Sequence, residues 1–365
     1  MSHRNSANPD YFFISLTFIL VIFGLVMLTS ASSDIAKLRF GDSYYYLKHQ
    51  LVYGFTLGIL GFTLGFFAYY RFWEKLSLVL LIINIILLGL VFTPFGINVK
   101  GAERWLNIGG LIFQPGEIIK LSFLIYLSAW LGKNQIRHLS FFKGLLPFLI
   151  LVGAVSFLLV LEPATTTAVL LFGASMILYF MGGAKMKFII GTVLLALIGL
   201  VTIIYLTPYR LQRVISYINP QEDELGSGYH INQALIAIGS GGITGVGYGN
   251  STTKIKYLPE PIGDSIFAVI AEELGFVGGI AIIGIFLMFV WRGLLIAKNS
   301  RDNFGQLLVT GFISLMGLQI FVNIGAISGL MPLTGVPLPF ISYGGTALAV
   351  FMTMCGIIVN VSKYK

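Results

Sequence analysis

Apolar stretches of about 20 residues recur along this chain, and each is long enough to cross roughly 30 Å of hydrocarbon as a helix. Only 10% of the 365 residues are charged, and 56% are hydrophobic. A soluble domain carries roughly 25% charged residues, so this chain has too few charges to cover a water-facing surface. We therefore expect an all-α, polytopic membrane protein that forms a single membrane-embedded domain over residues 1–365.

The hydropathy pattern predicts about ten membrane-spanning helices. Their expected limits are 11–32, 49–70, 73–96, 115–132, 143–161, 165–182, 187–206, 265–292, 304–328 and 343–361. The longest polar stretch, about 207–264, separates the seventh span from the eighth. Any chemistry at the membrane surface is expected in this large loop.

Basic residues predict the orientation of the spans, because short cytoplasmic loops are enriched in Lys and Arg. With the N-terminus inside, the short outer loops hold few of them: Lys37, Arg39, Lys48, Lys100 and Arg104. Both termini are then cytoplasmic, and the 207–264 loop is extracytoplasmic. The net charge of +8 follows from this topology. Clustered basic runs and nucleic-acid motifs are absent from the sequence, so no nucleic-acid partner is expected.

Asp264 lies where the long polar loop meets the eighth span, in the stretch Tyr257-Leu-Pro-Glu-Pro-Ile-Gly-Asp264-Ser265. An Asp at this point can cap the helix by accepting hydrogen bonds from its exposed N–H groups. It can also be a reactive carboxylate at the membrane surface. The residues alone leave both interpretations open.

Glu117 and Lys120 lie three residues apart in the first two turns of the fourth span, so they share one face. Ionisable groups in a span are costly and face a partner or a cavity. They form either a mutual ion pair that tolerates burial or a cation that waits for an anionic substrate. Glu272 and Glu273, deep in the eighth span, are expected to face the bundle interior or a partner helix.

Three other segments carry weaker signals. Glu162, in the short turn before Thr165-Thr-Thr167, is expected to be solvated. Glycines over 226–249 resemble a phosphate loop only superficially, because no strand precedes them and no Gly-Lys-Ser/Thr follows. Segment 329–346 is too rich in Pro and Gly for a straight helix, so we expect a broken element that lines the same outer cavity as Asp264.

Together these segments resemble the SEDS family of cell-wall polymerases, the FtsW/RodA/SpoVE group. No single piece is decisive, but they occur in the family order over nearly the whole chain. The Leu-Pro-Glu-Pro form and Ser-Ala-Ser resemble the division branch, FtsW, more than the elongation branch, RodA. The residues that carry the resemblance are Thr29-Ser-Ala-Ser32, Gly101-Ala-Glu-Arg-Trp105, Gln114-Pro-Gly-Glu-Ile-Ile-Lys120, Gly228-Tyr-His230 through Gly242, Gly245-Val-Gly-Tyr-Gly-Asn-Ser-Thr-Thr-Lys254, Tyr257-Leu-Pro-Glu-Pro261 with Asp264, Glu272-Glu-Leu-Gly275, and Pro332 through Thr346.

The chain departs from the family pattern at several positions. Pro163-Ala-Thr-Thr-Thr167 stands where a Pro-Asp-x-Gly-Thr pattern is usual, which puts any role of that turn in doubt. His230 stands where Gln is common, Gly263 where Thr is frequent, and Ser265 where Phe is usual. Asp264 itself is retained.

The resemblance implies a glycosyltransferase that polymerises lipid II, the undecaprenyl-pyrophosphate-linked disaccharide-pentapeptide, in the bacterial cytoplasmic membrane. It also implies a class B penicillin-binding protein as partner, together with other division proteins. Asp264 is the candidate general base, an effect worth roughly 10²–10⁴-fold. The candidate substrate-binding residues are Arg104, Glu117, Lys120, Arg210, Arg213, Lys254, Glu260 and Ser342.

Cations in a partly water-excluded site stabilise a departing pyrophosphate, which is the expected role of the basic candidates. A divalent cation such as Mg or Mn could assist, but no ligand cluster identifies one, and the single Cys355 excludes a Cys-rich site. Two rival functions stay open: a transporter that flips lipid II, and a non-catalytic division scaffold.

Overall fold

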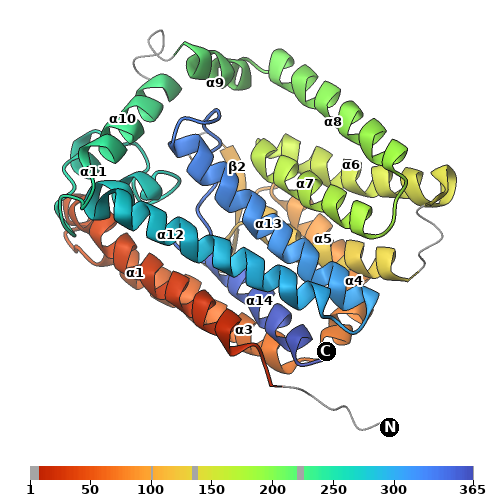
Figure 1. Cartoon of the computed structure of the whole chain (residues 1–365). Helices are drawn as coiled ribbons and strands as arrows, with labels where there is room; N and C mark the ends of the chain where they lie inside the picture. The colour runs from red at the N-terminus through yellow and green to blue at the C-terminus, as the bar shows by residue number, and fades with distance from the viewer. Residues whose placement is uncertain (1–7, 100–101, 134–138, 220–225, 365) are drawn as a thin grey trace.

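The computed structural model describes residues 8–99, 102–133, 139–219 and 226–364, and it is a bundle of helices with one small sheet (Figure 1). The first half contains α1 (Tyr11–Phe40), α2 (Tyr45–His49), the π-helical turn η1 (Gln50–Phe55), α3 (Thr56–Phe67), α4 (Tyr70–Leu90), β1 (Gly96–Val99), β2 (Ala102–Ile108), β3 (Leu111–Phe113), α5 (Pro115–Gly132), the π-helical turn η3 (Phe141–Leu145), α6 (Leu146–Leu161) and α7 (Thr165–Met181). The second half contains α8 (Met186–Leu206), α9 (Pro208–Ile218), α10 (Ser227–Ser240), α11 (Thr253–Lys256), α12 (Ile266–Lys298), α13 (Asn303–Ile327) and α14 (Gly345–Ser362).

Within the described residues, eight helical segments are long and apolar enough to cross a membrane. They are α1, α2 to α3, α4, η3 to α6, α8, α12, α13 and α14. The two other predicted spans correspond to α5, whose Glu117 and Lys120 lower its hydropathy, and to α7, an apolar helix of 17 residues. The expected polytopic all-α class is therefore confirmed.

Burial separates the central helices from the peripheral ones. About two-thirds of the apolar window of α13 and 78% of that of α14 are buried, against 6% for α8. α8 lies at the edge of the molecule and packs mainly against α7 and α9 (Figure 1). The apolar side chains that α8 exposes are suited to lipid, because a membrane helix gains nothing by hiding them from hydrocarbon.

The start of α1 and the end of α14 meet at one end of the bundle. The amide of Asp10 donates a 3.0 Å hydrogen bond to Ser362 Oγ, and Arg292 forms a 2.8 Å ion pair with Asp10. The opposite end, hereafter the loop-rich end, carries β1 to β3, α9 to α11 and the segment 328–344 (Figure 1). That end holds most of the polar loop residues singled out above.

The stretch between α4 and α5 contains an antiparallel meander, β1-β2-β3. Ile97 pairs with Trp105, and Leu106 pairs with Phe113. Gly109 and Gly110, both with positive φ, form the turn between β2 and β3.

A kink in α12 explains the Gly-rich stretch before it. Gly275 has φ 68° and ψ −168° inside the helix, which frees hydrogen-bonding groups on both sides of it. The amides of Val246 and Gly247 donate to the carbonyls of Glu272 and Glu273, and Phe276 N donates to Gly242 O. An added Cβ on Gly245 would lie 2.2 Å from Glu273 O. The glycines therefore allow this segment to satisfy the broken helix, as non-helical backbone in a membrane protein requires.

Candidate functional site

The cavity beside Asp264 has a volume of about 220 Å³ and opens at the loop-rich end. Four stretches of chain supply its walls: α9, the start of α10, the segment before α12, and the irregular segment before α14. The lining residues are Arg213, Gly226, Ser227, Tyr229, His230, Pro259, Asp264, Leu333 and Gly335. The expectation that segment 329–346 reaches the cavity of Asp264 is thus met by Leu333 and Gly335.

Hydrogen bonds to three successive backbone carbonyl groups hold the chain around Asp264 in place. Tyr343 N donates to Ile262 O at 2.8 Å, and Ser342 Oγ donates to Gly263 O at 2.6 Å. Asn323 Nδ2 donates to Asp264 O at 2.9 Å. Because buried carbonyls keep their partners, this arrangement fixes the position from which the Asp264 side chain extends.

Asp264 does not occupy the N-cap position of α12. Ser265 does, and its hydroxyl makes no capping bond to the helix. The hydroxyl instead donates to Pro259 O at 2.8 Å and lies 2.5 Å from His230 Nε2. Ser265, and not Asp264, therefore holds the capping position. This favours the second interpretation of Asp264, a reactive carboxylate.

The carboxylate of Asp264 and the guanidinium of Arg213 converge above Gly335. A Cβ added to Gly335 would lie 3.9 Å from Asp264 Oδ2 and 4.0 Å from Arg213 Nη1. Gly335 has φ +67°, a conformation that favours glycine. A carboxylate that can accept a proton and a guanidinium that can donate hydrogen bonds to an anion thus face one small space.

Arg213 is accompanied by two further guanidinium groups. Arg213 donates to Leu333 O and to the Tyr209 hydroxyl, and stacks on the Tyr209 ring at 4.6 Å. Arg210, one turn earlier on α9, donates to Val160 O at 3.3 Å. Arg104 donates to Glu162 O at 3.0 Å, and burial lowers its pKa, as do the charges of Arg213 and Arg210. Three cations therefore lie near enough to repel one another, which favours an anionic ligand.

The expectation that the Glu162 side chain is solvated is wrong. It is fully buried, and neither carboxylate oxygen has a hydrogen-bond partner among the described residues. Burial raises its pKa to about 8, against a smaller opposing effect of Arg104. Arg104 binds the backbone carbonyls of this turn, so its guanidinium does not pair with the carboxylate.

Glu117 and Lys120 form the buried ion pair that was one of their two alternatives. Lys120 Nζ lies 2.7 Å from Glu117 Oε1, and its side chain has no exposed surface. It also donates to Gln319 Oε1 at 3.0 Å, and Gln319 Nε2 donates to Pro337 O at 2.8 Å. These residues do not line the cavity but support the segment that does.

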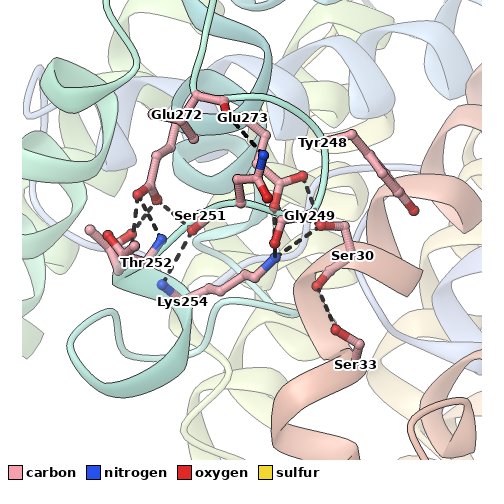
Figure 2. A network of polar contacts seen from close by, with 12 residues as sticks. Ser30, Ser33, Tyr248, Gly249, Ser251, Thr252, Lys254, Glu272 and Glu273 are labelled. Carbon is pink, nitrogen blue, oxygen red and sulfur yellow. Dashed lines mark hydrogen bonds and ion pairs between the residues drawn. The ribbon is translucent and has the colours of Figure 1, made fainter.

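Lys254 belongs to a second polar cluster (Figure 2). Its ammonium group is 2.7 Å from Glu273 Oε1 and donates to Ser30 Oγ and Gly249 O. Glu272 accepts hydrogen bonds from Ser251 and from the amide of Thr252. The expectation that Glu272 and Glu273 face the interior is met, whereas Lys254 is 2% exposed and does not line the cavity.

The two remaining candidates lie beside the cavity. Ser342 is buried and holds Gly263 O, so it contacts the Asp264 segment through the backbone. Glu260 is exposed, and its Oε2 lies 3.6 Å from the place of a Cβ on Gly263. Its negative charge raises the pKa of His230, against the larger effect of burial.

Asn323, Gln319 and His230 were not predicted as site residues. Asn323 and Gln319 are four residues apart on α13, with exposures of 1% and 0%. Two amides on one face of an apolar span were a usable signal, because buried polar groups need partners. Asn323 also donates to Val336 O at 2.7 Å, so it ties the two cavity-lining segments together.

The donor set does not fit a resident metal ion. Asp264 is the sole carboxylate among the lining residues, and the described part of the chain holds no group of three His, Cys, Asp or Glu suited to a metal. The hard cations need several oxygen ligands.

Comparison with known proteins gives consistent matches over the full length. The model of the family FTSW_RODA_SPOVE, described as "Cell cycle protein", matches residues 10–365. Stage V sporulation protein E of Bacillus subtilis (strain 168) is 37% identical over 359 residues, with 98% of each chain covered. The probable peptidoglycan glycosyltransferase FtsW of Geobacter sp. (strain M18) is 34% identical over 360 residues, again with 98% of each covered.

Two solved structures share the fold. A chain from the structure described as "Structural coordination of polymerization and crosslinking by a peptidoglycan synthase complex" matches with TM-score 0.82, 28% identity and 97% of each chain covered. The rod shape determining protein RodA of Thermus thermophilus matches with TM-score 0.72, 27% identity and 98% of each chain covered. These likenesses extend over the whole bundle, the loop-rich end included.

Proposed function

The chain belongs to the FtsW/RodA/SpoVE family, and from this premise we propose that it polymerises lipid II into glycan strands during cell division, with Asp264 as the general base. Relatives named as peptidoglycan glycosyltransferases cover the chain almost completely. The observation that carries the proposal is the convergence of the Asp264 carboxylate and the Arg213 guanidinium above Gly335. Glycosyl transfer from a pyrophosphate donor needs both groups.

The base acts on the acceptor. Asp264 takes the proton of a sugar hydroxyl, and the oxygen attacks the anomeric carbon of the donor sugar as the bond to the pyrophosphate oxygen breaks. The proton stays on Asp264 until solvent removes it. One displacement at an α-linked donor gives a β-linked product, so no second carboxylate is required as a nucleophile.

The arginines act on the leaving group. The departing lipid diphosphate gains negative charge, and fixed cations stabilise it best where water is partly excluded. Arg213 faces Asp264 across the cavity, with Arg210 and Arg104 behind it. A guanidinium presents two parallel N–H groups to a phosphate, so Arg213 is the first contact and the other two add to the positive potential.

The lipid part of the substrate fits the position of the cavity. α9, which supplies Arg213, presents Ile215 and Ile218 as exposed apolar residues, 38% and 69% accessible, on the side of the helix away from Arg213. A helix with cations on one side and apolar residues on the other lies in a membrane interface. The diphosphate can thus meet Arg213 at the headgroup level, while the undecaprenyl chain stays in the bilayer.

The orientation follows from the distribution of basic residues. Both termini lie in the cytoplasm, and the loop-rich end with its cavity faces the extracytoplasmic side of the cytoplasmic membrane. New glycan strands then emerge where a class B penicillin-binding protein can cross-link them. The related peptidoglycan synthase complex, in which polymerization and crosslinking are coordinated, supports such a partner.

A polymerisation assay in detergent tests this function. Purified protein is given lipid II, alone and with a candidate class B penicillin-binding protein, and the glycan products are separated by length. Polymer is the predicted product. A flippase or a scaffold yields none under these conditions, because neither makes glycosidic bonds.

A further inference from the structure

His230 lines the cavity of Asp264, and its side chain contacts Ser265, the residue that follows Asp264 in the chain. His230 Nε2 lies 2.5 Å from Ser265 Oγ. The first residue is on α10 and the second at the start of α12, 35 positions apart in the sequence. The contact therefore joins α10 to the N-cap residue of α12 directly beside Asp264.

The hydrogen bonds of Ser265 determine the tautomer of the imidazole. The Ser265 hydroxyl has a single proton, and it donates that proton to Pro259 O at 2.8 Å. The 2.5 Å contact with His230 then needs a proton on Nε2, which donates to Ser265 Oγ. Since a neutral imidazole has one N–H and one acceptor nitrogen, Nδ1 carries the free lone pair.

The ring is neutral in its working range of pH. The pKa of His230 is lowered to about 4, chiefly by burial; the charge of Glu260 opposes this shift, and the charge of Arg213 adds to it. A neutral ring with an acceptor nitrogen cannot serve as a cation for diphosphate. It is suited to accept a hydrogen bond from a hydroxyl or an amide.

Nδ1 is accessible from the cavity. No described residue donates to it, and it is not one of the buried polar atoms that lack a partner. His230 lines the same cavity as Asp264, Arg213 and Tyr229. An acceptor nitrogen, a carboxylate and a guanidinium therefore border one volume of about 220 Å³.

We propose that His230 binds the sugar part of the substrate, with Nδ1 accepting a hydrogen bond from a hydroxyl or acetamido N–H while Nε2 is tied to Ser265. The contact turns the amino sugar so that its reacting hydroxyl faces Asp264. This inference rests on the proposed polymerase function and adds a specificity-determining residue to it. A substrate that lacks this donor leaves a buried acceptor unpaired and binds more weakly.

Three variants separate sugar binding from a merely structural link. His230→Leu removes both nitrogens, His230→Asn keeps an acceptor near the position of Nδ1 but loses the bond to Ser265, and Ser265→Ala keeps the ring but removes its partner. Steady-state polymerisation of lipid II in detergent gives KM and kcat for each. Thermal unfolding of each variant reports whether it is folded.

The proposal predicts that His230→Leu raises KM roughly five- to tenfold, as expected for one lost hydrogen bond. His230→Asn recovers most of that loss, and Ser265→Ala changes KM less than His230→Leu. The pH dependence of kcat stays that of the wild type in all three, because the base is Asp264.

Equal losses in His230→Leu and Ser265→Ala, without recovery in His230→Asn, would mean that the link to Ser265 is only structural and would overturn the proposal. A pH profile that loses its acid limb in His230→Leu would overturn it as well, because His230 would then be a base. Failure of the polymerase function is a different result, since the wild type itself would then make no polymer.

Discussion

The carboxylate of Asp264 and the guanidinium of Arg213 approach one point above Gly335, at 3.9 Å and 4.0 Å from the position of a Cβ that glycine lacks. The two side chains come from positions about 50 residues apart, the segment just before α12 and the middle of α9. The space between them is bordered by a proton acceptor and by a hydrogen-bond donor for an anion.

Gly335→Ala puts a methyl group into the space between the two side chains and strains a backbone at φ +67°. A positive φ costs a non-glycine residue on the order of 1 kcal/mol, and the added methyl displaces substrate. We expect kcat/KM for lipid II to fall at least roughly tenfold, measured by polymer formation. Gly239→Ala on α10, where an added Cβ meets nothing within 4 Å, is the matched control and is expected to keep wild-type activity.

Arg213→Gln removes the cation nearest the carboxylate. Hydrogen bonds to charged groups are worth roughly 1.5–3 kcal/mol, so we expect a loss of kcat/KM of about 10- to 100-fold. Arg213→Lys is expected to recover only part of it, because an ammonium group cannot bind phosphate with two parallel N–H groups. Arg39→Gln, at the exposed end of α1, controls for net charge. Equal activity of Arg213→Gln and this control would exclude a role in leaving-group departure.

Asn323→Leu leaves the carbonyls of Asp264 and Val336 without their donor. Because a shift of about 1 Å at a catalytic group can cost on the order of 100-fold in rate, we expect kcat to fall by tenfold or more with a smaller change in KM. Thr310→Ala, on the same helix but bonded only to Gln306 O, is the control. A larger effect on KM than on kcat would argue against a positioning role for Asn323.

Glu162→Gln changes how stability depends on pH. The folded-state pKa of Glu162 is about 8, above its ordinary value of 4.5. The folded protein therefore keeps a proton that the unfolded chain releases, so the stability from this group is full below about pH 4.5 and is lost as pH rises through 8. Thermal unfolding in detergent from pH 5 to 9 is expected to show the wild type losing Tm relative to Glu162→Gln.

The matched control for this pH series is Asp42→Asn, a surface carboxylate that pairs with Lys48 and whose pKa is lowered. Its stabilising contribution is lost only as pH falls through its folded-state pKa, below the range of the experiment. Parallel curves for wild type and Glu162→Gln would contradict the account of Glu162.

The positions of the helices were predictable because hydrophobic length alone sets a span. Asp264, Arg104, Arg210 and Arg213 were named as candidates from the sequence, and the structure brings them to one region. The local sequence pattern could not predict which residues the Lys254 side chain contacts. Its partner Glu273 becomes reachable only because Gly275 breaks α12 and the preceding glycines fold against the break.

The same limit applies to Lys120 and Glu162. Sequence spacing placed Glu117 beside Lys120 but could not show whether the two form a buried ion pair or leave Lys120 open to a substrate. In the structure Lys120 is enclosed, and one of its partners, Gln319, lies 199 residues away in the sequence. Glu162 was expected in water because it lies in a turn, yet the turn itself is packed against Arg104. Burial of a short turn depends on tertiary contacts, which hydropathy does not report.

Asp264→Asn in the detergent polymerisation assay tests the central claim most directly. The amide keeps the size of the side chain and one acceptor oxygen but cannot take up the proton of a sugar hydroxyl. The account predicts that the variant unfolds at the wild-type temperature and yields no glycan polymer from lipid II, with or without the cross-linking partner. Glycan synthesis near the wild-type rate by Asp264→Asn would contradict it.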